Sequence, residues 1–264
     1  MTRFNRIALL SCLSAVSLAA QSAPTLTGTI RDFCAASAPV APPLGCTPLS
    51  DFEGPLPGLV TGMVGSTLSG GLPTAGASLV AGGSTAANFA KWYTASPGFN
   101  LSTATSLTLV EGPPGVFSYI SLSFFPIDGL LWGNQGNAHN YHFTMHLEGS
   151  LAFSDPTVGA DKFFTFTGDD DLWVFVDGKL VMDLGGVHGA VTSSFTEEDL
   201  KLLGLTAGTA YDLDIFFAER HTVASSFTIT TTLDITSTSV PEPGSLALVA
   251  VALLGLAGAR RRAS

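Results

Sequence analysis

The sequence predicts an all-β protein, an antiparallel β-sandwich or jelly-roll-like domain with one short helix. Two segments, 211–217 and 227–235, alternate apolar and polar residues with the period of half-buried strands. Asp177-Gly178 separates two β-forming runs and supplies the positive φ of a tight hairpin turn. Only 12% of the residues are charged, which suits a secreted β protein.

The other elements follow from local patterns. Residues 24–85 are rich in Gly, Pro, Ser and Ala and predict short strands with long loops. Residues 88–93 predict a helical turn with Phe89 and Trp92 packed inward. Strands are expected over 116–125 and 141–148, the second with Tyr141, Phe143, Met145 and Leu147 on one face. The helix is expected after Thr196, with Asp199 completing a capping box and Gly204 ending the segment.

Both chain ends have the composition of targeting segments, which leaves a folded domain over 24–237. In residues 1–23, two arginines precede an apolar run and a small-residue exit, as in a helical secretory signal peptide. Residues 238–264 hold a Pro-Glu-Pro triplet, an apolar run and three terminal arginines. That run predicts a short transmembrane helix with its arginines on the cytoplasmic side.

The C-terminal segment resembles the PEP-CTERM class of bacterial sorting signals. The matching residues are Pro241, Glu242 and Pro243, followed by the apolar run and by Arg260, Arg261 and Arg262. The resemblance implies a Gram-negative envelope, transient passage through the inner membrane and processing by an exosortase-type enzyme. It also implies a link to exopolysaccharide or biofilm matrix, with a plain tail anchor as the alternative.

Charge excludes several partners. Without its two ends the chain keeps 6 basic and 20 acidic residues, a net charge of about −14. Such a surface repels nucleic acid and anionic lipid and suits cations or neutral sugars. Cys34 and Cys46 remain as a pair, and a disulfide between them is expected outside the cytoplasm.

The most informative motif is the run Asp169-Asp170-Asp171 between two β-forming segments. Adjacent anions repel one another, and a strand gains nothing from them. A hard cation such as Ca²⁺, held by carboxylate and backbone oxygens, would offset the repulsion. The open alternative is an arginine paired with one of the aspartates.

The segment from Thr29 to Ile235 resembles the fibro-slime domain, a branch of the PA-fourteen β-sandwich superfamily. Four blocks carry the resemblance: 30–33 with 51–54, 89–93, 164–189, and 216–221. Directly before 51–54, Leu49 and Ser50 stand where such domains tend to have His-Pro.

The resemblance implies a metal and sugar site. In related sugar-binding domains two successive aspartates, joined by a cis peptide bond, bind Ca²⁺, and the ion holds sugar hydroxyls. Asp169 and Asp170 take those places here, and Asp171 beside them is expected to be a further metal ligand. Glu219 is implied as a further metal ligand, and Arg220, His221 and Ser225 as ligand-binding residues of the same loop.

The histidines have less specific interpretations. His188 lies in a Gly-rich turn and either approaches the acidic run or makes local hydrogen bonds. His142 and His146 lie about 13 Å apart along a strand, so they cannot share one ion. They are expected to be exposed histidines of that strand and not zinc ligands.

Three functions follow from these features. The first is a secreted, calcium-organised module that binds carbohydrate or mediates adhesion. The second is a structural matrix protein without a glycan ligand. The third, an enzyme, is disfavoured because adjacent aspartates on one turn do not face each other across a scissile bond.

Overall fold

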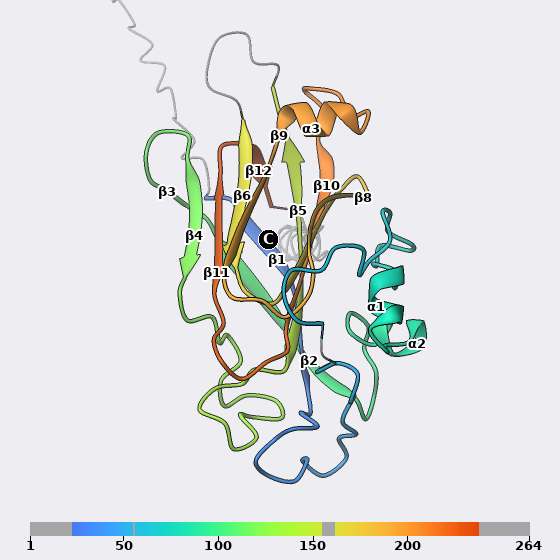
Figure 1. The fold of residues 1–264 in the computed structure, drawn as a ribbon. Coiled ribbons are helices and arrows are strands. Elements are labelled where there is room, and N and C mark those ends of the chain that lie inside the picture. The colour runs from blue at the N-terminus through green and yellow to red at the C-terminus, as the bar shows by residue number, and fades with distance from the viewer. Residues whose placement is uncertain (1–22, 55, 155–161, 238–264) are drawn as a thin grey trace, which may run out of the picture.

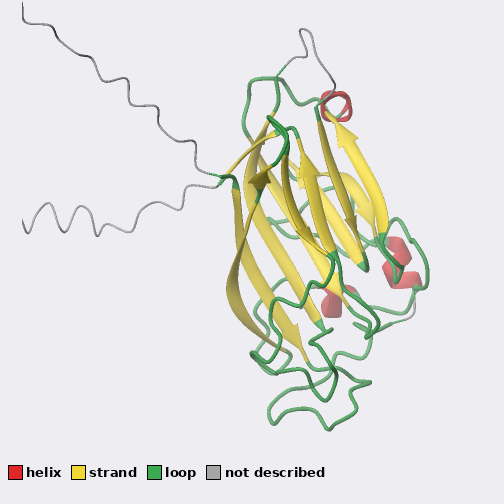
Figure 2. Ribbon diagram, turned by 90° about the vertical axis from the view of Figure 1, so that its left-hand side faces the viewer, coloured by secondary structure: helices red, strands yellow, loops and turns green. Residues whose placement is uncertain are grey.

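The computed structural model describes residues 23–54, 56–154 and 162–237, which form two antiparallel sheets packed face to face (Figures 1 and 2). The sheets remain separate, so the predicted sandwich is confirmed and a closed barrel is not formed. Predictions for the signal peptide and the sorting tail concern residues outside these ranges. None of the helices within the ranges is long and apolar enough to cross a membrane.

The larger sheet has seven strands. Along its main path they are β2 (Asn100–Thr108), β1 (Thr25–Phe33), β5 (Phe143–Ala152), β10 (Tyr211–Glu219), β7 (Asp171–Val176) and β8 (Lys179–Leu184). The seventh strand, β12 (Asp234–Thr236), pairs with the end of β5 that β1 leaves free. Thr25 and Ser237 therefore lie together, and the Thr25 backbone N–H donates to Ser237 Oγ at 3.2 Å.

The smaller sheet has five strands, in the order β3 (Val110–Glu111), β4 (Phe117–Ser121), β11 (Phe227–Thr231), β6 (Phe163–Gly168) and β9 (Val191–Thr196). The alternating segment 227–235, which reads as one strand in the sequence, is divided in the structure. The chain leaves the small sheet after Thr231 and joins the large sheet as β12. One alternating segment therefore contributes a strand to each sheet.

The main core lies between the sheets. Phe143, Met145 and Leu147 face inward from β5, as their alternation predicted, and meet Phe166 and Ile229 of the other sheet in one buried cluster. Burying such side chains contributes about 1.5–3 kcal/mol each, which makes this the main source of stability.

A second core covers the outer face of the large sheet. Residues from the segment 49–93 pack on Trp173, Phe175 and Phe216. Two short helices lie in this segment, both beside the sheet in Figure 1: α1 (Ala77–Ala81), which the sequence did not predict, and α2 (Ala86–Phe89), which overlaps the helical turn expected at 88–93. The expected turn at 88–93 thus begins earlier, and Phe89 and Trp92 are buried as predicted.

Two local predictions are confirmed. Helix α3 (Glu197–Leu202) follows Thr196 and has the capping box with Asp199. The hairpin between β7 and β8 turns at Asp177 and Gly178, with φ values of 53° and 67°.

Candidate functional site

The acidic run lies where the chain passes from the small sheet to the large one. β6 ends at Gly168, Asp169 and Asp170 form the connection, and Asp171 begins β7. Asp170 has a φ of 52°, in the left-handed region that aspartate tolerates better than most residues. The two-residue crossing therefore places three carboxylates at one end of the sandwich.

Asp171 is paired with Arg220, the residue that follows β10. The guanidinium binds the carboxylate through two nitrogens, with Nε on Oδ2 and Nη2 on Oδ1, the second at 3.1 Å. Both side chains are buried, at 1% and 0% exposure. The arginine alternative considered for the acidic run is therefore present for one of its three members.

Arg220 also joins parts of the chain that are distant in sequence. Its Nη1 donates to the carbonyls of Phe52 and Gly54, at 3.1 and 3.3 Å. Its guanidinium lies 5.4 Å from the Trp92 ring centre, and the Gly186 N–H donates to Asp171 Oδ1 at 2.6 Å. The ion pair therefore holds together all four of the sequence blocks that carry the fibro-slime resemblance.

The carboxylates of Asp169, Asp170 and Glu219 form no salt bridge within the described ranges. Asp169 Oδ1 accepts from the backbone and hydroxyl of Ser226, and Asp170 Oδ2 accepts from the Arg220 N–H at 2.9 Å. Glu219 Oε1 accepts from the His221 N–H at 3.3 Å. One oxygen of each carboxylate is thus engaged by a neutral donor.

Two oxygens at this end are buried without a partner. The Ser225 hydroxyl lies close enough to Glu219 to lower its pKa somewhat. Neither Ser225 Oγ nor Glu219 Oε2, however, makes a hydrogen bond of normal geometry. A buried polar atom of this kind costs about 1–3 kcal/mol, so such atoms in native proteins require an explanation.

Burial shifts the acidity of this cluster. It raises the pKa of Asp170 to about 7, helped by the neighbouring Asp171 and opposed by the Arg220 N–H. Burial, with the charge of Asp170, also raises the pKa of Glu219 well above its ordinary value. Burial therefore favours the protonated form of both carboxyls, and an added cation would favour the ionised form.

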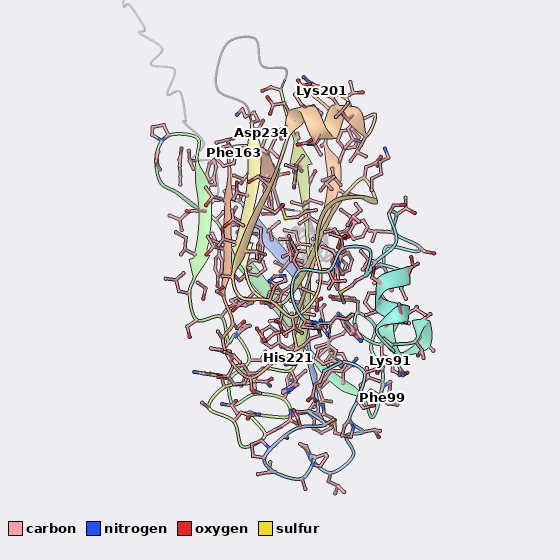
Figure 3. All side chains as sticks on the ribbon, in the orientation of Figure 1. Lys91, Phe99, Phe163, Lys201, His221 and Asp234 are labelled. Carbon is pink, nitrogen blue, oxygen red and sulfur yellow. A yellow bond between two sulfur atoms is a disulfide. The ribbon has the colours of Figure 1, made fainter. Side chains whose placement is uncertain are left out.

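A cavity of about 220 Å³ opens beside the aspartates. Its wall is formed by Asp169, Asp170, Val187, His188, Gly189, His221, Val223 and Ala224. His188 and His221 are half-buried, and His221 Nε2 has no hydrogen-bond partner within the described part of the chain. Figure 3 labels His221 at this end, opposite Phe163 and Asp234.

The structure thus gathers most of the predicted site and corrects one detail. Asp169, Asp170, His188 and His221 line the cavity, with Glu219 and Ser225 buried next to them along the chain, whereas Arg220 is committed to Asp171. No peptide bond in the described ranges is cis, so the Asp169–Asp170 bond is trans and the bend comes from the φ of Asp170.

In the described ranges, Asp169, Asp170 and Glu219 do not form a group of three whose ligand atoms all lie within 4.8 Å of one another. In the described ranges, one group of three His, Cys, Asp or Glu residues has its ligand atoms within 4.8 Å of one another, and it lies elsewhere, at His146, Glu148 and Asp214. The carboxylates of Asp169, Asp170 and Glu219 would have to move closer to hold an ion between them.

Sequence reasoning missed the supports of the site. The carbonyls of Phe52 and Gly54 and the N–H of Gly186 are backbone groups, which residue identity does not reveal. Gly186 has a φ of 95°, and a side chain there would meet the Gly58 carbonyl oxygen. Near the same end, Cys34 and Cys46 are joined by a disulfide, the pairing that the sequence analysis expected.

Comparison with known proteins places this geometry in a class. Residues 128–245 match the PA14 domain, and residues 239–262 match the PEP-CTERM protein-sorting motif. The chain thus contains a match to the PA14 domain over less than half of its length and a match to the PEP-CTERM motif at its C-terminal end, as the sequence resemblances indicated. Together they indicate an extracellular or cell-envelope location.

Among individual proteins, the chain is similar to several from Dictyostelium discoideum. Protein psiQ is 36% identical over 212 residues, which cover 74% of this chain and 21% of psiQ. Protein psiC is 39% identical over 158 residues, which cover 56% of this chain and 29% of psiC. The chain thus spans less than a third of the length of these two relatives.

Solved structures give more distant likenesses. A PA14 sugar-binding domain from an RTX adhesin is 20% identical, with a TM-score of 0.25, over 37% of this chain and 52% of that one. The PA14 domain of the MpAFP antifreeze protein is 11% identical, with a TM-score of 0.27, over 48% and 69% of the two chains. These TM-scores are too low to support a conclusion about this chain.

Proposed function

We propose that this chain is a non-enzymatic binding module of a bacterial extracellular matrix, which uses Ca²⁺ to organise its acidic end and hold a carbohydrate. The PA14 domain and the sorting motif support the class of module and its location. The calcium, the glycan and the matrix are the proposed parts. The glycan is an exopolysaccharide or a cell-surface glycan.

One observation carries the proposal. Asp170 and Glu219 are buried, at 4% and 0% exposure, and neither forms a salt bridge in the described ranges, because the adjacent Arg220 guanidinium is paired with Asp171 and only its more distant charge acts on Asp170. Burying an ionised carboxylate without a partner is costly. A divalent cation between them would supply the missing charge.

The available atoms fit a hard cation. Ca²⁺ takes six to eight oxygens from carboxylates, carbonyls and water. Asp169 and Asp170 each retain one oxygen without a described hydrogen bond, and Glu219 Oε2 and Ser225 Oγ are unpartnered and buried. Water would complete the coordination, and the ion would draw the three carboxylates closer together.

The adjoining cavity suits a small neutral ligand. Its volume of about 220 Å³ is below the range of drug-sized pockets, which begins at about 300 Å³, and suits a single sugar ring. The imidazoles of His188 and His221 offer hydrogen bonds, while Val187 and Val223 offer apolar contact. Sugar hydroxyls would also occupy coordination positions on the ion.

A structural role is the second candidate, and the Arg220–Asp171 pair favours it. That pair neutralises one aspartate without any ion and ties four sequence blocks together. In this version the acidic end only fixes loops, and the chain binds no glycan. In both versions an exosortase-type enzyme at the inner membrane would process the tail that contains Pro241, Glu242 and Pro243.

A melting experiment tests the calcium. The full chain should melt at a higher temperature in Ca²⁺ than in chelator, because a ligand at a hundredfold excess over its Kd stabilises by about 2.7 kcal/mol. The double variant Asp169→Asn, Asp170→Asn should lose this difference. Asp234→Asn, at the opposite end in Figure 3, is the matched control and should keep it.

Glycan retention then separates the two candidates. Calcium-dependent retention on matrix polysaccharide, lost in the same double variant, supports the binding module. A calcium-dependent melting temperature without any retention supports the structural role. If Ca²⁺ and chelator give the same melting curve, the calcium proposal is wrong.

A further inference from the structure

A second cluster of ligand-type side chains lies on the outer face of the large sheet. His146 and Glu148 come from β5, and Asp214 comes from β10. The register places Asp214 directly opposite Glu148, and side chains two residues apart on a strand share a face. One ligand atom from each of the three residues lies within 4.8 Å of the others.

Two of these side chains are already held in place. His146 Nε2 lies 2.8 Å from Asp214 Oδ1, and the two side chains are 13% and 14% exposed. The imidazole stacks on the Phe216 ring, with 4.1 Å between centres and 15° between planes. Glu148 is exposed and completes the cluster from the solvent side.

The charges at this place are unbalanced. Glu148 and Asp214 are like charges directly opposite each other on an antiparallel pair, an arrangement that is destabilising. They line a cleft of about 230 Å³ together with Asp212, Leu213, Gly149 and Gly71. None of these lining residues is basic, so an added cation would be stabilised here.

We infer that His146, Glu148 and Asp214 form a binding site for a divalent transition-metal ion, of which Zn²⁺ is the representative. One imidazole nitrogen and two carboxylate oxygens are donors that Zn²⁺ accepts, at about 2.0–2.2 Å. Two ligand atoms of a tetrahedral ion then lie about 3.3–3.6 Å apart. The present separations of 2.8 Å and at most 4.8 Å bracket this range.

This site is separate from the proposed calcium site. Asp214 precedes Glu219 by five residues on β10, which is about 16 Å along a strand, and the two sites share no residue. Its nitrogen donor also distinguishes it from an all-oxygen calcium site. Three protein ligands leave a fourth position at the cleft, where water or a donor from another molecule binds.

Metal titration of the full chain tests the site. After removal of metals with chelator, Zn²⁺ binding is measured by calorimetry, and Co²⁺ is added as a coloured probe of nitrogen-and-oxygen coordination. Glu148→Gln and Asp214→Asn should each weaken Zn²⁺ binding at least about tenfold, as expected for the loss of a ligand. Both should also weaken the visible Co²⁺ absorption.

His139→Gln is the matched control. His139 also pairs with a carboxylate, Asp128 at 2.5 Å, but it belongs to no three-residue cluster in the described ranges. This variant should bind Zn²⁺ like the unaltered chain. Because Glu148 is exposed, Glu148→Gln should fold normally, which an unchanged melting temperature in chelator would verify. Unaltered Zn²⁺ affinity in Glu148→Gln and Asp214→Asn, or no Zn²⁺ binding by the unaltered chain, overturns the inference.

Discussion

Arg220 and Asp171 form a buried, two-point ion pair that connects the start of β7 to the end of β10. Each residue also bonds to a loop from another part of the chain, Arg220 to 52–54 and Asp171 to Gly186. The pair therefore fixes the frame in which the remaining carboxylates are held.

Arg220→Met should destabilise the protein by about 3–5 kcal/mol, because it leaves Asp171 buried without its partner. The measurement is the free energy of unfolding in urea. Adding Asp171→Asn to Arg220→Met should recover part of the loss, because the two residues are directly coupled. Lys179→Gln removes the exposed pair with Asp177 and should cost less than about 1 kcal/mol. Equal losses in Arg220→Met and Lys179→Gln would contradict the proposed role of the buried pair.

Acidification should stabilise the metal-free protein between pH 7 and about 4.5. The pKa of Asp170 is about 7 in the folded chain against an ordinary value of 3.8, so in this window the folded state binds a proton that the unfolded state lacks. Stability is therefore highest at the acidic end and falls as pH rises, by up to about 1.4 kcal/mol per pH unit for each extra proton.

Other carboxyls contribute to this pH experiment, among them Glu219, whose pKa is also raised. Burial raises the pKa of Asp32 to about 7, against hydrogen bonds from Asn140 and Trp132, so Asp170→Asn should reduce the slope without removing it. Burial would also raise the pKa of Glu53, but the His142 imidazole, 3.7 Å away, and hydrogen bonds from Ser37 and Ala36 outweigh it and lower that pKa to about 2. Its contribution has the opposite sign below about pH 4.5. A slope that Asp170→Asn leaves unchanged, in urea unfolding with chelator, would show that Asp170 titrates normally.

Gly186→Ala should disturb the ion pair from the side of the loop. The φ of 95° is unfavourable for alanine, and the new methyl group would meet the Gly58 carbonyl oxygen and lie 3.0 Å from that of Leu56. We expect a loss of more than about 1 kcal/mol in unfolding free energy. Gly189→Ala is the control in the same loop, because nothing lies within 4 Å of its added carbon. Similar stabilities for the two variants would refute the constraint at Gly186.

Phe89→Ala should reveal whether the second core unfolds with the sandwich. Phe89 is 1% exposed and packs on Trp92 and Trp173, so its truncation should cost about 3–5 kcal/mol. The test is whether far-ultraviolet circular dichroism and tryptophan fluorescence report one shared transition at lower urea. Leu202→Ala, at an 85% exposed position, should change stability by less than about 0.5 kcal/mol. Separate transitions would show that the segment 49–93 unfolds independently.

The local patterns of the sequence predicted much of the fold. Alternation assigned the inner face of β5, the Asp-Gly pair located the β7–β8 hairpin, and the capping box located α3. These features depend on neighbours in the chain. The division of 227–235 between two sheets depends on distant strands, and alternation alone does not distinguish one sheet from the next.

The site shows the same limit. The sequence indicated that Asp169, Asp170 and Glu219 belong together and left open whether a metal or an arginine compensates the aspartates. The structure shows that Arg220 compensates Asp171, a choice that depends on side-chain reach across two strands. The spacing of His142 and His146 along one strand concealed the cross-strand neighbour Asp214, which only the β5–β10 register reveals.

The contact between Thr25 and Ser237 has a further consequence. Thr25 and Ser237, at the two ends of the described domain, lie together, and Figure 3 places His221 toward the end of the sandwich opposite Asp234, with further loops beyond it. If a surface holds the chain through the residues after Ser237, about the length of a strand separates the attachment from the acidic loops. The domain then acts as a spacer, and its carboxylate pole is available to whatever approaches from outside.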